Sequence, residues 1–400
     1  MKYLSVILTG LVIATAVNAT DWPQWRGPNG DGISTESDWT AQWPATGPKQ
    51  LWKSNVGLGC SSITVSQGRA YTQGNKDATD TVYCFDAATG TVRWKHSYPC
   101  PLAPLYWEGG TLATPTVDGD RVYTLSKVGQ LFCFQAATGK ILWQKNLETD
   151  FGGKMPKWGF AGSPFVVNQW LLLDTGAPDS ALLALDKLTG AVAWKNGGDP
   201  AGYSTPTLFT FQGKQCLAVF NGFGLVVHEL NGGKEVARFP WKTTHEVNAA
   251  TPIVMGDKIF IASGYGTGCA LLRLETGRLT ELWRNKSMRN HFASCVLWQG
   301  YLYGFDESTL TCLEFATGAV KWTEPSLGKG ALLLADGKLI IQSEKGDLVF
   351  AAAEPAAYKE IARAKVLSGK CWVVPVLANG RLYVRNNAGD LVCLDVTKPK

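Results

Sequence analysis

The chain has 400 residues, of which 18% are charged, 45% are hydrophobic and 44 are glycine. A charged fraction below the roughly 25% of soluble proteins, combined with abundant glycine, is typical of strands joined by tight turns, and the hydrophobic fraction excludes a disordered chain. The net charge of +5 is small and has no basic stripe, so nucleic acid is not expected as a partner.

The first nineteen residues have the order of an export signal. Lys2 supplies a positive charge, residues 3–17 form an apolar run, and Val17-Asn18-Ala19 is a small-residue cleavage site. The alternative, an uncleaved membrane anchor, is disfavoured because the apolar run is short. No cysteine follows the site for attachment of a lipid. We therefore predict a signal peptide over 1–19 and a periplasmic or secreted bacterial protein without a membrane span after cleavage.

Two further features precede the main part of the chain. Residues 20–47 form an N-terminal extension that opens with Asp21-Trp-Pro-Gln-Trp-Arg-Gly-Pro-Asn29. Residues 49–53 then have the composition of an outer strand with its tryptophan, Trp52, but no hairpin precedes them. This strand needs a partner elsewhere in the chain.

Residues 48–396 repeat one pattern. Cys84-Phe-Asp-Ala-Ala-Thr-Gly90 is followed four residues later by Trp94, and similar copies lead to Trp143, Trp194 and Trp322. Two weaker copies around glycines 233 and 277 lack tryptophan at the fourth position. Successive glycines at 90, 139, 190, 233, 277 and 318 lie 49, 51, 43, 44 and 41 residues apart. This period predicts the blades of a β-propeller.

Each copy predicts a four-stranded antiparallel blade. The acidic or amide residue caps a turn, and Thr-Gly provides the positive φ of a tight hairpin. Seven blades are expected near 58–97, 112–147, 161–197, 204–241, 250–286, 292–325 and 330–366. Three strands of an eighth blade cover 371–396, and the strand at 49–53 would complete it and close the ring. The alternative is seven blades with a loose tail; residues 397–400 form a tail in either case.

The cysteines divide into two groups. Cys84, Cys133, Cys312 and Cys393 share one repeat position, which Ala184 fills in the third copy, so this position needs a small apolar group. We expect these four thiols to be buried and free. In an oxidising compartment, the expected disulfide partners are instead those in or near loops, namely Cys60, Cys100, Cys269 and Cys371.

The Asp-x-x-Thr-Gly-x-x-x-Trp repeat resembles the tryptophan-docking motif of the eight-bladed propellers built from pyrroloquinoline quinone (PQQ) repeats. That family contains PQQ-dependent alcohol dehydrogenases and a non-catalytic branch that includes BamB, a propeller of the outer-membrane barrel assembly machinery. The opening residues also resemble secreted PQQ-like propellers labelled polyvinyl-alcohol dehydrogenase. The resemblance implies an all-β, eight-bladed propeller in which Trp94, Trp143, Trp194 and Trp322 pack between neighbouring blades.

The candidate site lies in the loops that join the outer strand of one blade to the inner strand of the next, because these loops open at the mouth of the channel. Aromatic rings that stack and cations that meet carboxylates would suit an anionic aromatic ligand. The alternative is that the loops are solvated and their tryptophans fill space. The candidate cofactor-binding residues are Trp107, Lys157, Trp158, Asn248, Arg289, Asn290, His291, Lys329, Lys370 and Trp372.

A dehydrogenase of this family implies further requirements. These are PQQ, Ca²⁺, a carboxylate base and a pair of adjacent cysteines against which the quinone stacks. Glu108 or Glu246 could act as the catalytic base, and with Asn248 they could supply calcium ligands, although their spacing does not define a metal site. Adjacent cysteines are absent, and no Cys-x-x-Cys-His sequence is present to attach haem.

These observations favour a binding or scaffolding module of the cell envelope, acting as a monomer on an envelope protein or a glycan. The alternative is a PQQ-dependent dehydrogenase of alcohols or polyvinyl alcohol, with PQQ and calcium as its cofactors. Gly264-Tyr-Gly-Thr-Gly268 is predicted to be a turn between strands, because no helix follows it to hold a nucleotide.

Overall fold

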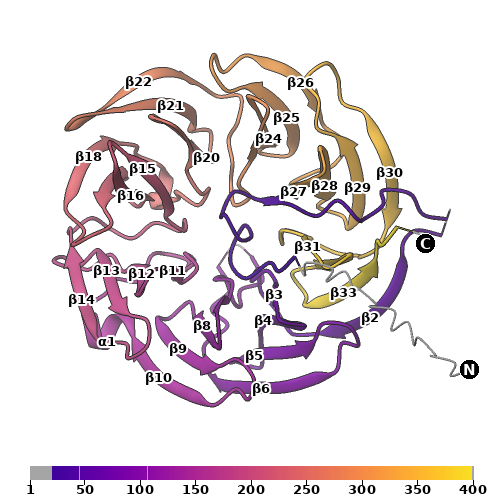
Figure 1. Ribbon diagram of the computed structural model, residues 1–400, viewed down its shortest axis with the longest axis horizontal. Coiled ribbons are helices and arrows are strands. Elements are labelled where there is room, and N and C mark those ends of the chain that lie inside the picture. Colours follow the sequence, from indigo (N-terminus) through magenta and orange to yellow (C-terminus); the bar gives the residue numbers. More distant parts are fainter. Residues whose placement is uncertain (1–19, 45, 106, 399–400) are drawn as a thin grey trace, which may run out of the picture.

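The computed structural model describes residues 20–44, 46–105 and 107–398. Eight sheets surround a central axis as the blades of a propeller (Figure 1); each has four antiparallel strands, and one gains a fifth strand from the N-terminal extension. The predicted all-β, eight-bladed fold is therefore confirmed. The predicted signal peptide lies outside the described residues. No helix in the described part of the chain is long and apolar enough to cross a membrane.

The first four blades follow one another along the chain. A short helix, α1 (Leu147–Phe151), follows blade 2, and a 3-10 turn, η1 (Thr244–Glu246), follows blade 4. The strands are β3 (Thr64–Ser66), β4 (Arg69–Lys76), β5 (Thr79–Asp86) and β6 (Val92–Pro99) in blade 1; β7 (Thr116–Asp118), β8 (Arg121–Leu125), β9 (Gln130–Gln135) and β10 (Ile141–Asn146) in blade 2; β11 (Phe165–Val167), β12 (Trp170–Asp174), β13 (Leu182–Asp186) and β14 (Val192–Asn196) in blade 3; and β15 (Thr207–Phe211), β16 (Lys214–Phe220), β17 (Gly224–Glu229) and β18 (Glu235–Pro240) in blade 4.

The last four blades complete the ring. Their strands are β19 (Ile253–Met255), β20 (Lys258–Ser263), β21 (Gly268–Glu275) and β22 (Arg278–Asn285) in blade 5; β23 (Val296–Trp298), β24 (Tyr301–Asp306), β25 (Thr309–Glu314) and β26 (Val320–Glu324) in blade 6; β27 (Ala331–Ala335), β28 (Lys338–Gln342), β29 (Asp347–Ala352) and β30 (Glu360–Lys365) in blade 7; and β31 (Val376–Ala378), β32 (Arg381–Arg385) and β33 (Asp390–Asp395) in blade 8.

The N-terminal strand β2 (Lys49–Asn55) supplies the fourth strand of blade 8. It pairs antiparallel with β33, from Lys49 opposite Asp395 to Asn55 opposite Asp390. Trp52 in this strand is buried, and its indole Nε1 donates a hydrogen bond to the carbonyl oxygen of Ala87 in blade 1. The predicted closure of the ring is therefore confirmed, and the alternative of seven blades with a loose tail is wrong.

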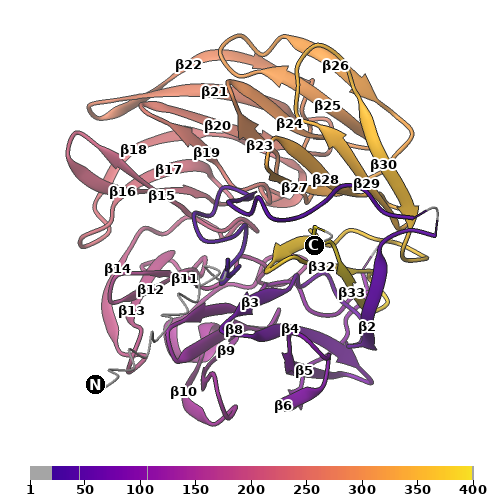
Figure 2. The same cartoon turned by 45° about the vertical axis from the view of Figure 1, so that its right-hand side comes forward.

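The N-terminal extension before β2 packs against several blades, which the sequence does not predict. Residues 21–34, which we call the N-terminal strap, cross the centre of the ring (Figures 1 and 2). Trp22 bridges to Val65 in blade 1, and β1 (Ile33–Ser34) pairs parallel with β27 as a fifth strand of blade 7. Between them, the buried guanidinium of Arg26 donates to the carbonyl oxygen of Cys295 before blade 6. The strap thus connects blade 1 with blades 6 and 7, which are not its neighbours in the ring.

The repeated residues hold neighbouring blades together. The indole Nε1 of Trp94 in blade 1 donates to the carbonyl oxygen of Ala136 in blade 2 at 2.9 Å. Its ring covers Gly139, where an added Cβ would lie 2.6 Å from the indole, so this position needs glycine for space as well as for its φ of +73°. The equivalent pairs are Trp52 with Gly90, Trp143 with Gly190, Trp194 with Gly233, and Trp283 with Gly318.

The repeat copy around Gly277 therefore also has a tryptophan that packs on the next blade, namely Trp283. The β21–β22 hairpin is longer, with Glu275 opposite Arg278, so Trp283 follows the glycine by six positions instead of four. In blade 4 the position is held by Ala237, opposite Val227.

Cysteine occupies the middle of the blade for a geometric reason. Cys84 lies opposite Tyr71 on one neighbouring strand and opposite Trp94 on the other, so only a small side chain fits between the two rings. Cys84, Cys133, Cys312 and Cys393 are fully buried as predicted. All ten cysteines are free, so the disulfides expected among Cys60, Cys100, Cys269 and Cys371 are not formed. Two of these thiols have other partners: Cys269 lies 3.1 Å from Asn285 Oδ1, and Cys371 lies 3.7 Å from the Gly369 carbonyl oxygen.

Candidate functional site

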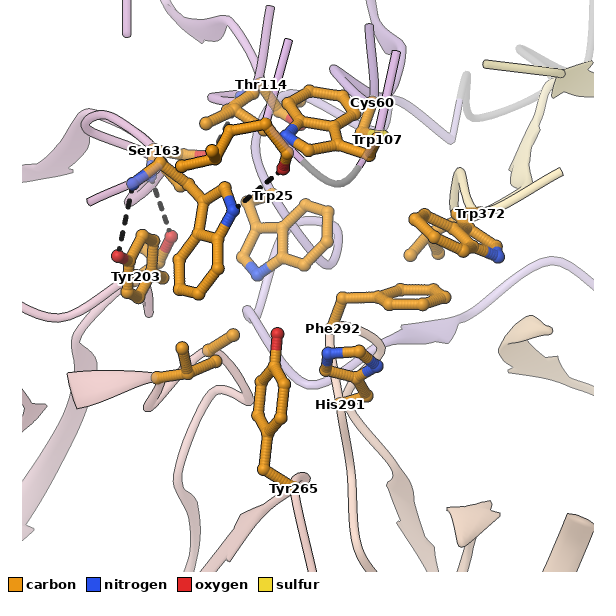
Figure 3. A pocket seen from close by; sticks show the side chains of 18 residues that line it. Trp25, Cys60, Trp107, Thr114, Ser163, Tyr203, Tyr265, His291, Phe292 and Trp372 are labelled. Carbon is orange, nitrogen blue, oxygen red and sulfur yellow. Dashed lines mark hydrogen bonds between the residues drawn. The ribbon is translucent and has the colours of Figure 1, made fainter. Parts of the chain in front are cut away.

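A pocket of about 240 Å³ lies at one mouth of the central channel (Figure 3). Its lining comes from the segments that precede the inner strands of seven of the eight blades, as the sequence predicts, together with the strap and one hairpin turn. Eight aromatic side chains dominate the lining: Trp25, Trp107, Trp158, Tyr203, Tyr265, His291, Phe292 and Trp372.

Trp25 of the strap forms the floor of the pocket. Its indole Nε1 donates to the hydroxyl of Thr251 at 3.0 Å, which fixes the ring below the aromatic side chains of the mouth. The strap therefore contributes one side chain to a pocket whose other lining residues come from the blades.

A row of hydroxyl groups runs along the pocket from blade to blade. The backbone N–H of Ser62 donates to the hydroxyl of Thr114, that of Thr114 to Ser163, and that of Ser163 to Thr205, at 2.9 to 3.0 Å. Each hydroxyl therefore serves as an acceptor for its neighbour. None of the described residues accepts the hydrogens of Thr114, Ser163 and Thr205, so these O–H groups stay available as donors.

One aromatic wall is built around Trp158. Its indole Nε1 donates to the carbonyl oxygen of Leu105 at 3.1 Å, and its ring stacks with that of Tyr265 at a centroid distance of 6.4 Å. The Lys157 ammonium lies 5.1 Å from the Trp158 ring centroid and 3.2 Å from His245 Nε2. Trp158 and Lys157 are therefore brought together at the mouth, with Lys157 at the rim.

The opposite wall contains Trp372 and an ion pair behind it. The ammonium of Lys370 lies 2.6 Å from Glu108 Oε1 and 4.6 Å from the centroid of the Trp372 ring. The ring centroids of Trp372 and Phe292 are 4.7 Å apart. Burial opposes the ionisation of Glu108, but the hydrogen bond and charge of Lys370 outweigh it and lower the pKa of this carboxyl. Glu108 is thus held as a carboxylate bound to a cation, which weakens it as a base.

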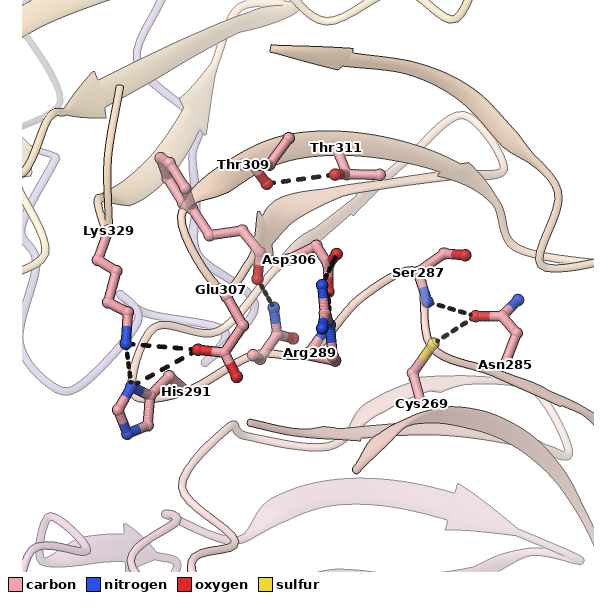
Figure 4. A network of polar contacts seen from close by, with 12 residues as sticks. Cys269, Asn285, Ser287, Arg289, His291, Asp306, Glu307, Thr309, Thr311 and Lys329 are labelled. Carbon is pink, nitrogen blue, oxygen red and sulfur yellow. Dashed lines mark hydrogen bonds and ion pairs between the residues drawn. The ribbon is translucent and has the colours of Figure 1, made fainter. Parts of the chain in front are cut away.

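His291 joins the pocket to a polar network (Figure 4). Its Nδ1 lies 2.9 Å from the Lys329 ammonium, which in turn lies 3.4 Å from Glu307. Burial and the charge of Lys329 lower the pKa of His291, against the opposing effect of Glu307. An ammonium can only donate, so Nδ1 accepts and Nε2 carries the hydrogen of the neutral ring. His291 can therefore donate from its other nitrogen.

Eight predicted site residues do not line the pocket. Lys157, Lys329 and Lys370 contact lining residues from outside, Glu108 pairs with Lys370, and the other four lie elsewhere. Arg289 is paired with Asp306 through two short hydrogen bonds, at 2.6 and 2.7 Å. The amides of Asn248 and Asn290 are buried and donate to backbone carbonyl groups, so they support the loops from behind. Glu246 is exposed in η1.

The pocket also contains residues that the sequence analysis did not identify, namely Trp25, Cys60, Tyr265 and Phe292. Phe292 directly follows the predicted His291. Burial raises the pKa of the Cys60 thiol to about 12, which keeps this thiol protonated at neutral pH. Tyr265 comes from the predicted turn between β20 and β21, where the Thr267 N–H donates to the Gly264 carbonyl oxygen. That hairpin ends at the same mouth as the blade-joining loops.

The fold and the site together define a closed propeller with an aromatic pocket at one mouth of its channel. A family model described as outer membrane protein assembly factor BamB, of the PQQ-repeat type, matches residues 78–324. The match covers more than half of the chain, and the protein belongs to this family. A comparison with curated proteins found no match.

Solved structures with the same fold include enzymes and a designed protein. The quinohemoprotein alcohol dehydrogenase of Comamonas testosteroni is 14% identical with a TM-score of 0.67, over 95% of this chain and 81% of its own. The computationally designed Ika8 protein is 12% identical with a TM-score of 0.62, over 88% of this chain and 100% of its own. At these identities the similarity establishes the fold alone.

The residues present do not fit the PQQ and Ca²⁺ that part of the family implies. None of the 18 residues that line the pocket is a carboxylate, lysine or arginine. Within the described part of the chain, no group of three or more His, Cys, Asp and Glu side chains is arranged to hold a metal ion. The expected calcium ligands do not form one site. Glu108 is paired with Lys370, Asn248 is buried and Glu246 is exposed.

Proposed function

We propose that this protein is an exported binding module that captures a ligand or partner of the cell envelope in its aromatic pocket. The observation that supports the proposal is the pocket itself, which eight described aromatic side chains line. Large amphipathic side chains such as tryptophan contribute most of the binding energy at such sites. The export-signal pattern of residues 1–19 supports an envelope or extracellular location, and a monomer suffices because a single chain forms the whole site.

A PQQ-dependent dehydrogenase remains the alternative. Its support is the fold shared with quinoprotein enzymes, and fold does not define function. Catalysis would require a base free to take a proton, whereas Glu108 is bound to Lys370 at 2.6 Å and Glu246 lies outside the pocket lining. The geometry therefore favours binding over oxidation.

Replacing Trp107, Trp158 or His291 by alanine is expected to abolish the capture of envelope partners in a pull-down from solubilised envelopes. The melting temperature should change little for Trp107→Ala, because this ring lines an open pocket and not a blade interface. Trp94→Ala is the matched control: it removes an indole between blades, so it should lower the melting temperature while partner capture persists at low temperature. Unchanged capture by all three pocket variants would contradict the proposal.

A further inference from the structure

We propose that the pocket binds a neutral sugar ring, either as a free sugar or as the end of a glycan. This inference rests on the proposed function, because it names the ligand of the same pocket. It depends on three properties of the site: its charge, its hydrogen-bond donors and the shape of its walls.

Two of the lysines near the pocket are neutralised by carboxylates of the protein, and a third, Lys157, contacts Trp158 and His245 at the rim. Lys370 is paired with Glu108, and Lys329 is paired with Glu307. His291 accepts a hydrogen bond from Lys329, so its ring stays neutral and contributes no positive charge. An anionic ligand would have to break these pairs, and a cationic one would face the ammonium groups of these lysines. A neutral ligand avoids both costs.

The polar groups on the pocket wall are mainly donors. Thr114, Ser163 and Thr205 each accept from a backbone N–H and keep their own O–H for a ligand. Figure 3 shows the hydroxyl of Tyr265 pointing into the pocket, and no described residue bonds to it. A ligand that offers several oxygen acceptors along one edge would satisfy these donors. Hydroxyl and ring oxygens of a sugar have this arrangement.

Tyr265 lies in a tight turn whose backbone is strained at this residue. It has a φ of +53°, which is unfavourable for a bulky residue, and it is followed by Gly266 at +72° in a tight turn. The edge of its ring packs against His291 at a centroid distance of 4.6 Å. The turn and the contact with His291 together set the position of the Tyr265 ring at the pocket.

The walls suit the apolar face of a pyranose. Trp107 and Trp372 present flat rings around the pocket, with Trp25 between and behind them (Figure 3). Trp158 lines the same pocket. The volume of about 240 Å³ lies below the roughly 300–1,000 Å³ of pockets for drug-sized ligands, so the pocket holds a small ligand of one or two rings. Longer glycans would extend outward past the loops.

Fluorescence titration of the mature chain tests this inference. The probes are the methyl glycosides of glucose, galactose, mannose and N-acetylglucosamine, linear oligomers of the same sugars, and glucuronate as the anionic counterpart of glucose. At least one neutral sugar should change the tryptophan emission saturably, and glucuronate should bind more weakly than glucose. Tighter binding of oligomers would indicate a glycan, and equal binding would indicate a free sugar.

Two variants make the test specific. Tyr265→Phe should weaken the binding of that sugar about tenfold, because it removes one donor and keeps the ring. Tyr301→Phe, in β24 and outside the pocket lining, is the matched control and should bind normally. Lack of binding by every neutral sugar, tighter binding of glucuronate, or equal binding by the Tyr265 variant would overturn the inference. Partner capture that persists without sugar binding would reject the sugar and leave the proposed function intact.

Discussion

Deleting residues 20–56 from the mature chain is expected to open the ring and make the protein aggregate. The deletion removes β2 and therefore exposes the edge of β33, a row of backbone groups that another chain can pair with. It also removes Trp52, which is buried and stacks with Phe85 in blade 1 at a centroid distance of 5.8 Å. The free energy of unfolding should fall by several kcal/mol, measured by thermal and denaturant unfolding.

Two variants separate closure from the other effects of the deletion. A chain that starts at residue 37 loses the strap but keeps β2, so it should remain folded, with a smaller loss of stability. Trp52→Ala in the intact chain should cost about 3–5 kcal/mol, the usual range for a buried tryptophan. If the chain that lacks residues 20–56 melts within a few degrees of the intact protein, closure by β2 does not stabilise the ring.

Arg385→Met is expected to destabilise the junction between blades 8 and 1, which we call the seam, by removing buried hydrogen bonds. Arg385 in β32 is fully buried, and its guanidinium donates to the carbonyl oxygens of Ser61, Gln73 and Gly57 in or next to blade 1. Burial lowers the pKa of this group to about 10, so it stays charged at neutral pH. Removing it leaves several buried acceptors without a donor, which should cost about 3–5 kcal/mol.

Arg381→Met provides the matched comparison for this substitution. Arg381 lies four residues earlier in β32, is partly exposed and makes no hydrogen bond to the described residues. Denaturant unfolding of both variants should therefore show a large loss for Arg385→Met and less than about 1 kcal/mol for Arg381→Met. Equal losses would mean that the seam does not depend on the hydrogen bonds of Arg385.

The sequence predicts the ring well because the fold is a repeat. Each Thr-Gly hairpin marks one blade, and the unpaired strand with Trp52 predicts how the last blade is completed. The strap could not be predicted, because β1 has two residues and its partner, β27, lies some 300 residues away. Likewise, the spacing alone does not assign Trp283 to the repeat position, because a longer hairpin places it six residues after the glycine instead of four.

The repeat also predicts part of the candidate site, because it shows which loops join neighbouring blades. Loop residues such as Trp107, Trp158 and Trp372 do line the pocket, because all blade-joining loops meet at one mouth. Sequence position alone could not separate them from Asn248 and Asn290, which belong to the same loops but turn inward to bond with the backbone. Trp25 belongs to a segment without a repeat, so nothing in its spacing placed it at the pocket floor.

The most direct test of the proposed binding function is a titration of the purified, folded protein with PQQ and Ca²⁺, followed by an assay for alcohol-dependent reduction of an artificial electron acceptor. Because none of the described residues that line the pocket is a carboxylate, lysine or arginine, we expect no saturable absorbance change and no reduction of the acceptor. Reduction that depends on Ca²⁺ and is lost in Glu108→Gln or Glu246→Gln would contradict this account and identify the protein as a quinoprotein dehydrogenase.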